Sequence, residues 1–166
     1  MQVTIRGFQE EDIQKKVEWI NNPSNNRYLH YTLPLTIDKT TDWFFRVKDR
    51  QDRLDCVITA DGIACGLIGL LHIDSGRREA EYYITMGETA LKRKGIAFNA
   101  SKLLLDTAFS SMGLTTVYLF TEPENRPAQH LFRKLGFKKE SGVSADVYPG
   151  GKPAFRFVIH APEWAD

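Results

Sequence analysis

Hydrophobic and polar residues alternate in some stretches of the chain and recur at helical spacing in others. Alternation predicts a strand, because successive side chains of a strand point to opposite faces, whereas apolar residues three and four apart share one helix face. Strands are predicted over residues 2–6, Leu54–Ala60, Ile63–Ile73, Glu79–Met86, 115–121, Phe137–Val147 and Phe155–His160. Helices are predicted over Asp12–Ile20, through Val47 after a cap at Asp38 or Thr40, within the loop and helix of residues 92–112, and over 125–135.

Turn residues indicate how these elements are connected. Asp61-Gly62 predicts a tight hairpin between the second and third strands. Pro23 ends the first helix, and residues 21–35 are expected to form an irregular loop or a short helix. Antiparallel strands followed by alternating strands and helices imply a mixed sheet with helices on its faces. The length of 166 residues suits one domain, residues 1–166, of the α/β (mixed α+β) class.

Composition and charge narrow the classes of function. A hydrophobic content of 42% and a charged content of 26% are typical of an ordinary soluble globule. The net charge of +1 gives no general attraction to nucleic acid or a membrane, and no apolar run approaches the roughly 20 residues that span a bilayer. We therefore expect a cytoplasmic protein with neither partner. Cys56 and Cys65 are expected close together on paired strands and without a metal, as two reduced thiols, with a disulfide between them as the alternative.

A basic loop leads into the predicted helix after residue 92. Lys92, Arg93 and Lys94 precede Gly95, and the helix begins directly afterwards. Free N–H groups and the dipole of a helix start attract anions, so this loop is a candidate phosphate or pyrophosphate site. It lacks the spacing of a P-loop and of the G-x-G-x-x-G fingerprint. A helix start on a solvated basic loop is the alternative interpretation.

Two segments together resemble the acetyl-CoA-dependent GNAT N-acetyltransferase superfamily. Residues 92–97 resemble its pyrophosphate motif [QR]-x-x-G-x-[GA], and residues 125–137 resemble its N-x-x-A-x-x-L-[YF]-x-K-x-G-F element. The segment Trp19-Ile20-Asn21-Asn22-Pro23 is similar to the W-x-N-x-P of the RimJ/RimL-like branch. The resemblance implies a mostly antiparallel sheet flanked by helices, in which two central strands splay apart and acetyl-CoA enters the gap.

The resemblance also implies which residues bind acetyl-CoA. The pyrophosphate would lie on backbone N–H groups of the loop and helix start. The strand around Ile84 and Met86 would pair with the pantetheine arm and supply an oxyanion donor. Asn125 would bond the cofactor arm, cap its own helix, or do both. The expected cofactor-binding residues are Ile84, Met86, Lys92, Arg93, Lys94, Gly95, Ile96, Ala97, Phe98, Asn125 and Phe132.

Acetyl transfer to an amine needs a base, because an alkylamine with a pKa of about 10.4 is mostly protonated at pH 7. Glu79, Glu81 and Tyr83 share one face of their predicted strand. Glutamates on the matching strand of the family often take the proton through a water. Glu81 is therefore the predicted base and Glu79 the second candidate. The alternative is that both carboxylates are solvated strand residues.

Position 132 departs from the family. Many members have a tyrosine there that protonates the leaving thiolate, and Phe132 cannot do so. Tyr82, Tyr83 and Tyr118 are possible substitutes, or the thiolate leaves without a dedicated acid. This departure keeps an alternative function open, a catalytically inactive CoA-binding sensor or accessory protein.

The acceptor pocket is expected opposite the CoA entry. Candidate residues are Tyr28, His30 and Tyr31 in one aromatic loop, together with the turn 148–151, although packing of this loop on the core is an equal alternative. The expected acceptor is a primary amine, either a protein N-terminus or a small amine such as an amino sugar. The expected assembly is a monomer or a homodimer.

Overall fold

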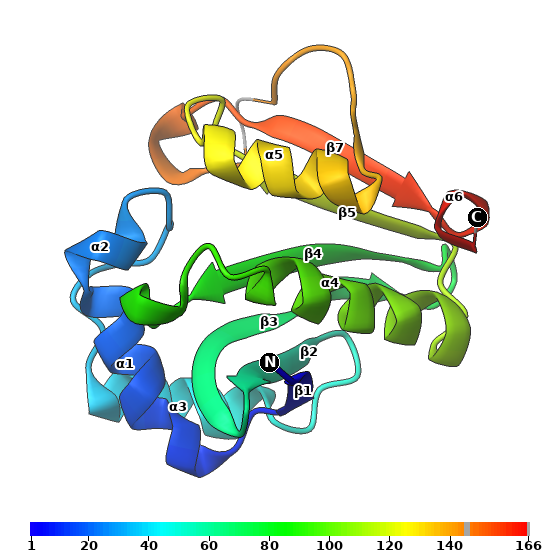
Figure 1. Ribbon diagram of the computed structural model, residues 1–166. Helices are drawn as coiled ribbons and strands as arrows, with labels where there is room; N and C mark the ends of the chain where they lie inside the picture. The colour runs from blue at the N-terminus through cyan, green and yellow to red at the C-terminus, as the bar shows by residue number, and fades with distance from the viewer. Residues whose placement is uncertain (145–146, 166) are drawn as a thin grey trace.

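The computed structural model describes residues 1–144 and 147–165 of the chain. Its strands form one sheet in the order β1-β2-β3-β4-β5-β7-β6 (Figure 1). All neighbours pair antiparallel except β4 and β5, which are parallel, so the predicted mixed, mostly antiparallel sheet is confirmed. The strands are β1 (Val3–Gly7), β2 (Leu54–Ala60), β3 (Ile63–Asp74), β4 (Glu79–Met86), β5 (Thr116–Thr121), β6 (Lys138–Lys139) and β7 (Phe155–His160).

Helices cover both faces of this sheet. Alternate side chains of the strands pack against α4 and α5 on one face, and against α1 on the other, where Trp19 and Ile20 meet Val57 and Leu67. Figure 1 shows α4 and α5 in front of the sheet and α3 behind it. The helices are η1 (Glu10–Asp12), α1 (Ile13–Asn21), α2 (Pro23–Asn26), α3 (Ile37–Val47), η2 (Thr89–Leu91), α4 (Ile96–Asp106), the π-helical turn η3 (Thr107–Ser111), α5 (Arg126–Leu135), η4 (Pro149–Gly151) and α6 (Ala161–Ala165).

Two sequence predictions about local structure were wrong. The cap of α3 is Thr36, whose hydroxyl accepts from the Lys39 N–H at 3.2 Å, and not Asp38 or Thr40. The strand predicted over Phe137–Val147 is reduced to β6 and one isolated pairing of Ser144 with Ala154. Gly142 has a φ of 87°, which turns the backbone out of a strand. Residues 145–146 of that prediction lie outside the described residues.

The predicted hairpin is confirmed. Asp61 and Gly62 have φ angles of 50° and 81°, the left-handed values of a two-residue hairpin turn. Cys56 and Cys65 are buried free thiols on the paired strands β2 and β3. Cys56 lies opposite Ile68 rather than opposite Cys65, and burial raises the pKa of its thiol to about 11.

The parallel pair β4 and β5 separates partway along its length. The two strands are paired at Glu79–Thr116, Ala80–Val117 and Glu81–Tyr118. Beyond Glu81, β4 continues to Met86 alongside β3 without a partner on the β5 side. The sheet therefore opens at Glu81, and the backbone edge of β4 past this point is available to a ligand.

Candidate active site

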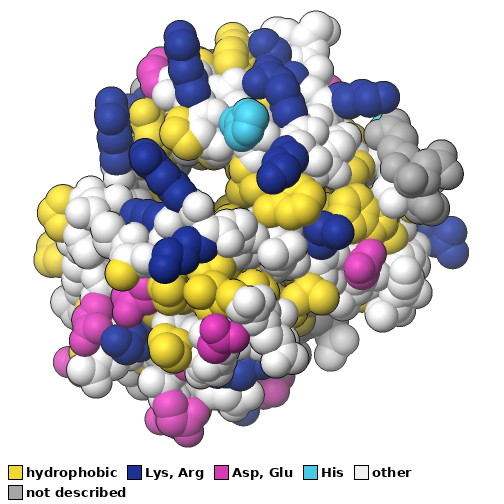
Figure 2. Space-filling view, viewed as in Figure 1, with side chains coloured by type: hydrophobic (Ala, Val, Ile, Leu, Met, Phe, Trp, Pro, Cys, Tyr) yellow, Lys and Arg dark blue, Asp and Glu magenta, His cyan; other side chains and the backbone are white. Residues whose placement is uncertain are grey.

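A cavity of about 540 Å³ lies where β4 and β5 separate. Its walls come from the ends of both strands past their last mutual pair, from α5 and from the loop after α2. In the space-filling view, Lys and Arg side chains gather on the face that carries α4 and α5, around an indentation (Figure 2). The lining residues include Glu81–Met86, Leu119–Glu122, Asn125, Pro127, Ala128, Phe132, Tyr28–Tyr31, Lys16, Arg53, Asp55, Lys92 and Tyr148.

The start of α4 is built to receive an anion. Gly95 is the N-cap with a φ of 77°, and no side chain caps this helix. The first N–H groups of a helix have no intrahelical acceptor, so those of Ile96, Ala97 and Phe98 are available. A Cβ at Gly95 would meet no protein atom within 4 Å, which leaves the space before the loop open. A glycine is therefore needed here because of the positive φ, which other residues rarely adopt, and not because space is short.

The basic loop reaches the cavity through one of its three cations. Lys92 lines the cavity, and its Nζ donates to Asn25 Oδ1 at 2.6 Å and to the Ser24 carbonyl at 3.1 Å. Arg93, Lys94 and the start of α4 are not part of the cavity wall. The structure therefore places the predicted pyrophosphate loop beside the cavity rather than inside it.

Only one of the two predicted bases faces the cavity. Glu81 lies in its wall at the last paired position of β4, with its side chain 23% exposed. Burial raises the pKa of its carboxyl, and His72, whose Nε2 is 3.9 Å away, partly offsets this. Glu79 lies outside the cavity wall, 3.9 Å from Arg77. The geometry favours Glu81.

Phe132 is buried at the α5 side of the cavity. It is 5% exposed and packs edge-on against Tyr82, with ring centroids 5.8 Å apart. The Tyr82 hydroxyl is 2.7 Å from Ser101 Oγ, which itself donates to the Ala97 carbonyl. Tyr82 is therefore the donor to Ser101, and its proton is already engaged. Burial raises the pKa of Tyr82, so the phenol stays protonated at neutral pH.

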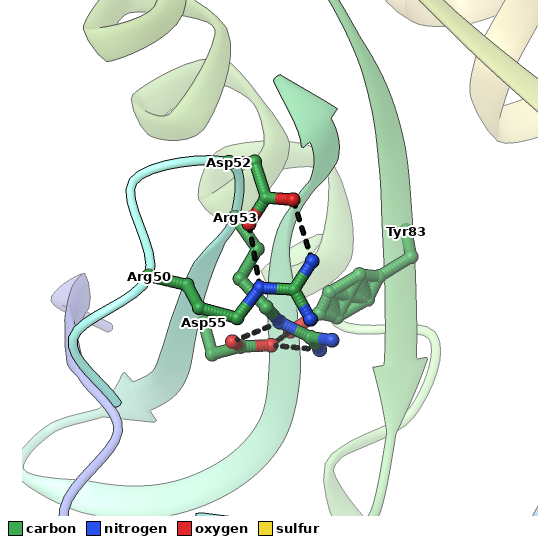
Figure 3. Close-up of polar contacts among 5 residues, drawn as sticks. All are labelled: Arg50, Asp52, Arg53, Asp55 and Tyr83. Carbon is green, nitrogen blue, oxygen red and sulfur yellow. Dashed lines mark hydrogen bonds and ion pairs between the residues drawn. The ribbon is translucent and has the colours of Figure 1, made fainter. Parts of the chain in front are cut away.

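Tyr83 points to the opposite face of β4. Its hydroxyl donates to Asp55 Oδ1 at 2.5 Å, and Asp55 also accepts two hydrogen bonds from Arg53 (Figure 3). The three side chains are half-buried, and the charges of Arg53 and Asp55 neutralise each other. Tyr118, the third candidate acid, lies outside the cavity wall with Arg156 4.6 Å from its ring centroid.

The aromatic loop predicted to bind the acceptor does line the cavity. Asn21 holds it in place, because its side chain exchanges two hydrogen bonds with the Leu35 backbone, at 2.7 and 2.9 Å. Tyr28, His30 and Tyr31 all reach the wall. The His30 ring stacks on Tyr148 at 3.6 Å between centroids, so the structure also brings the predicted 148–151 turn to this site.

The wall also contains residues that sequence reasoning missed, among them two buried charged side chains, Glu122 and Lys16. Glu122 is 8% exposed, and its Oε2 lies 3.3 Å from His30 Nε2. Its position directly after β5 was the available signal. Lys16 is 7% exposed, with its Nζ 3.3 Å from the Trp43 ring centroid, and burial lowers its pKa to about 8. Lys16 has no such signal, because a lysine on an amphipathic helix is usually solvated.

The described residues hold neither a metal-binding cluster nor a membrane-spanning helix. Within residues 1–144 and 147–165, no three His, Cys, Asp or Glu side chains are grouped so that they could hold a metal ion. No helix in the same part of the chain is both long and apolar enough to cross a membrane.

Residues 2–138 match the acetyltransferase (GNAT) domain family, so the chain belongs to that family. This confirms the enzyme class predicted from the sequence, an acetyl-CoA-dependent N-acetyltransferase. The splayed β4–β5 pair and the uncapped start of α4 fit acetyl-CoA as the co-substrate.

Relatives of known or proposed activity match most of the chain. The chain is 29% identical over 150 residues to spermidine N(1)-acetyltransferase of Escherichia coli (strain K12), covering 90% of this chain and 80% of that protein. It is 25% identical over 159 residues to the putative ribosomal N-acetyltransferase YdaF of Bacillus subtilis (strain 168), covering 90% and 85%.

A solved structure shares the whole fold. Spermidine N-acetyltransferase from Vibrio cholerae, in complex with CoA and spermine, superimposes with a TM-score of 0.90 at 23% identity, over 99% of each chain. At this identity the likeness shows the fold alone.

Proposed function

We propose that this enzyme transfers the acetyl group of acetyl-CoA to a primary amine of a small polyamine, by direct attack of the amine on the thioester. The observation that carries the proposal is the cavity at the β4–β5 opening, with two carboxylates in its wall, the half-buried Glu81 and the buried Glu122. Carboxylates suit a cationic acceptor. The similarity to spermidine acetyltransferases supports the same class of acceptor. Membership of the RimJ/RimL-like branch, a cytoplasmic location and the oligomeric state stay predictions.

The residues that would hold acetyl-CoA lie along one route into the gap. The uncapped N–H groups at the start of α4 receive the pyrophosphate, with Arg93 and Lys94 beside them. The free edge of β4 at Ile84–Met86 pairs with the pantetheine amides, as a peptide adds to a sheet edge. Asn125 caps α5 by accepting from the Ala128 N–H at 3.3 Å, which leaves its amide N–H groups for the cofactor arm.

The chemistry depends on one carboxylate and on backbone donors. Acetyl-CoA supplies the thioester. Glu81 takes the proton of the acceptor ammonium, through a water, and burial suits it to this role because it raises the carboxyl pKa toward neutral. A backbone N–H near Ile84–Met86 stabilises the oxyanion. With Phe132 in place of a tyrosine and Tyr82 engaged with Ser101, the thiolate leaves without a dedicated acid, which its pKa of about 8.5 allows.

A panel assay tests this proposal. The protein is mixed with acetyl-CoA and, separately, with spermidine, a nucleotide amino sugar and a peptide with a free N-terminus, and release of free thiol is followed. We expect the highest kcat/KM with spermidine. A preference for the peptide would contradict the acceptor class, and thiol release no faster than without amine would favour the CoA-binding sensor.

A further inference from the structure

The cavity has a second polar centre at the end of β5, away from the predicted base. Glu122 and His30 face each other there, with 3.3 Å between Oε2 and Nε2. His30 Nε2 is buried and has no hydrogen-bond partner within the described residues, because the contact with Glu122 does not have hydrogen-bond geometry. A buried polar atom without a partner is uncommon, since it forfeits the hydrogen bonds it would make with water. Glu122, which faces this atom, lines the cavity and is the group of the pair that a ligand there can reach.

The protonation of His30 decides which ligand fits. Burial lowers the pKa of its imidazole, and the nearby Glu122 only partly offsets this, so the ring is neutral at pH 7. With its proton on Nε2, the neutral ring directs an N–H toward Glu122 Oε2, and this contact is one of the influences that raise the pKa of His30. His30 therefore orients the carboxylate, and Glu122 is the acceptor of the centre. A primary ammonium carries three donors and no acceptor, so it can donate to this carboxylate.

The surroundings hold these two groups in place. The His30 ring stacks on Tyr148 with an interplanar angle of 9°, which fixes its orientation and provides an aromatic wall. Lys152 is the competing cation, but its Nζ lies 3.9 Å from the other oxygen of Glu122, and its side chain is 61% exposed. Such an exposed pair contributes little. The charge of the Glu122 carboxylate therefore remains available to a ligand.

This centre lies at a useful distance from the predicted base. Glu81 is opposite Tyr118 in the parallel pair, and Glu122 follows Tyr118 by four residues. At about 3.3 Å per residue, the two carboxylates are separated by roughly 13 Å along the strand direction. Burial raises the pKa of Tyr148, and the charges of Glu122 and Glu81 raise it further. Tyr148 is therefore close enough to both carboxylates to interact with them electrostatically. One elongated ligand could reach both ends.

We infer that Glu122, oriented by His30, binds the second, charged ammonium of the acceptor while its other amine reacts beside Glu81. This inference rests on the proposed function and adds to it. The enzyme should select molecules with two well-separated amines over monoamines, and Glu122 becomes the residue that determines this specificity.

The test compares a diamine with the monoamine of the same chain length, α,ω-diaminooctane against octylamine. Charge-assisted hydrogen bonds predict a kcat/KM about 10- to 100-fold higher for the diamine, expressed mainly in KM. Glu122→Gln keeps the shape and removes the charge, so this ratio should fall to within about threefold of one. His30→Phe keeps the stack on Tyr148 and removes the ring nitrogen that contacts and orients Glu122, so it should lower the ratio too. Glu124→Gln, a change at a nearby exposed carboxylate, should keep it.

The other outcomes separate this inference from the proposed function. Turnover of both amines with a wild-type ratio near one would overturn the inference and leave the acetyltransferase proposal intact. An equal fall of kcat for both amines in Glu122→Gln, in a variant with unchanged thermal stability, would make the pair part of the proton-transfer machinery and also overturn it. Absence of turnover with every amine would contradict both.

Discussion

Replacing the buried Lys16 with methionine should stabilise the protein in a pH-dependent way. Lys16 is 7% exposed, and its ammonium lies in a cage formed by Trp43, Tyr31 and Phe8, at 3.3, 5.7 and 6.0 Å from the ring centroids. Methionine has a similar length, keeps the aromatic contacts and carries no charge. The substitution therefore removes mainly the penalty of a buried ammonium.

The magnitude follows from the pKa. Burial lowers the pKa of Lys16 from 10.5 to about 8, and one pKa unit corresponds to about 1.4 kcal/mol, so the buried charge costs about 3 kcal/mol at pH 7. The cation–π contact with Trp43 favours the charged form by about 2 kcal/mol at most. We expect Lys16→Met to raise the free energy of unfolding at pH 7 by about 1 to 3 kcal/mol.

The sign of the pH dependence is fixed by proton binding. Below the folded-state pKa of about 8, Lys16 is protonated in both states, and the wild type carries the full penalty. Above it, the folded state loses the proton while the unfolded state keeps it up to about pH 10.5, so the wild-type free energy of unfolding rises. The advantage of the variant should therefore shrink between pH 7 and pH 10.

Urea unfolding of both proteins across this pH range measures the difference directly. Other titrating groups largely cancel, because they are common to both chains. Lys15→Met, whose lysine side chain is 50% exposed, is the matched control and should show no such trend. A difference that stays constant within about 0.5 kcal/mol from pH 7 to pH 10 would refute the reasoning and show that Lys16 keeps an ordinary pKa.

Three further changes test the proposed chemistry. Glu81→Gln should lower kcat by about 10²–10⁴-fold and remove the acidic limb of the pH–rate profile, with acetyl-CoA affinity retained; a wild-type profile would exclude Glu81 as the base. In Gly95→Asn the new residue tolerates the left-handed backbone but places a side chain in front of α4, so calorimetry should show weaker acetyl-CoA binding. The control Gly62→Asn, in the distant hairpin, should bind acetyl-CoA normally. Phe132→Tyr should raise turnover below pH 8 if expulsion of the thiolate limits the rate; no gain at any pH, with a loss in Tyr82→Phe, would indicate that Tyr82 is the acid.

The sheet could be predicted from the sequence because its strands carry local signals. The Asp61-Gly62 turn has the residue types that a left-handed two-residue turn requires, and the structure shows that conformation. The cap of α3 was misplaced because Thr36, Asp38 and Thr40 are all competent cap residues. Thr36 has the extended backbone that a cap needs, and the sequence does not display this.

Some residues of the candidate site could likewise be predicted from the sequence, and others could not. Gly95 and Asn125 belong to motifs, so their positions at the starts of α4 and α5 followed from the chain alone. Glu122 and His30 are 92 residues apart in the sequence (122 minus 30) and meet only because the loop after α2 folds over the end of β5. Lys16 is caged by side chains from three separate segments. Contacts of this kind depend on tertiary packing and have no local pattern.

The most direct test of the central claim is the mass of spermidine after incubation with the enzyme and acetyl-CoA. The account predicts a monoacetylated product that forms with wild-type protein, accompanied by one free thiol per acetyl group, and that forms far more slowly with Glu81→Gln. Unmodified spermidine after prolonged incubation, with an enzyme that demonstrably binds acetyl-CoA, would contradict the claim that the opening between β4 and β5 is a polyamine acetylation site.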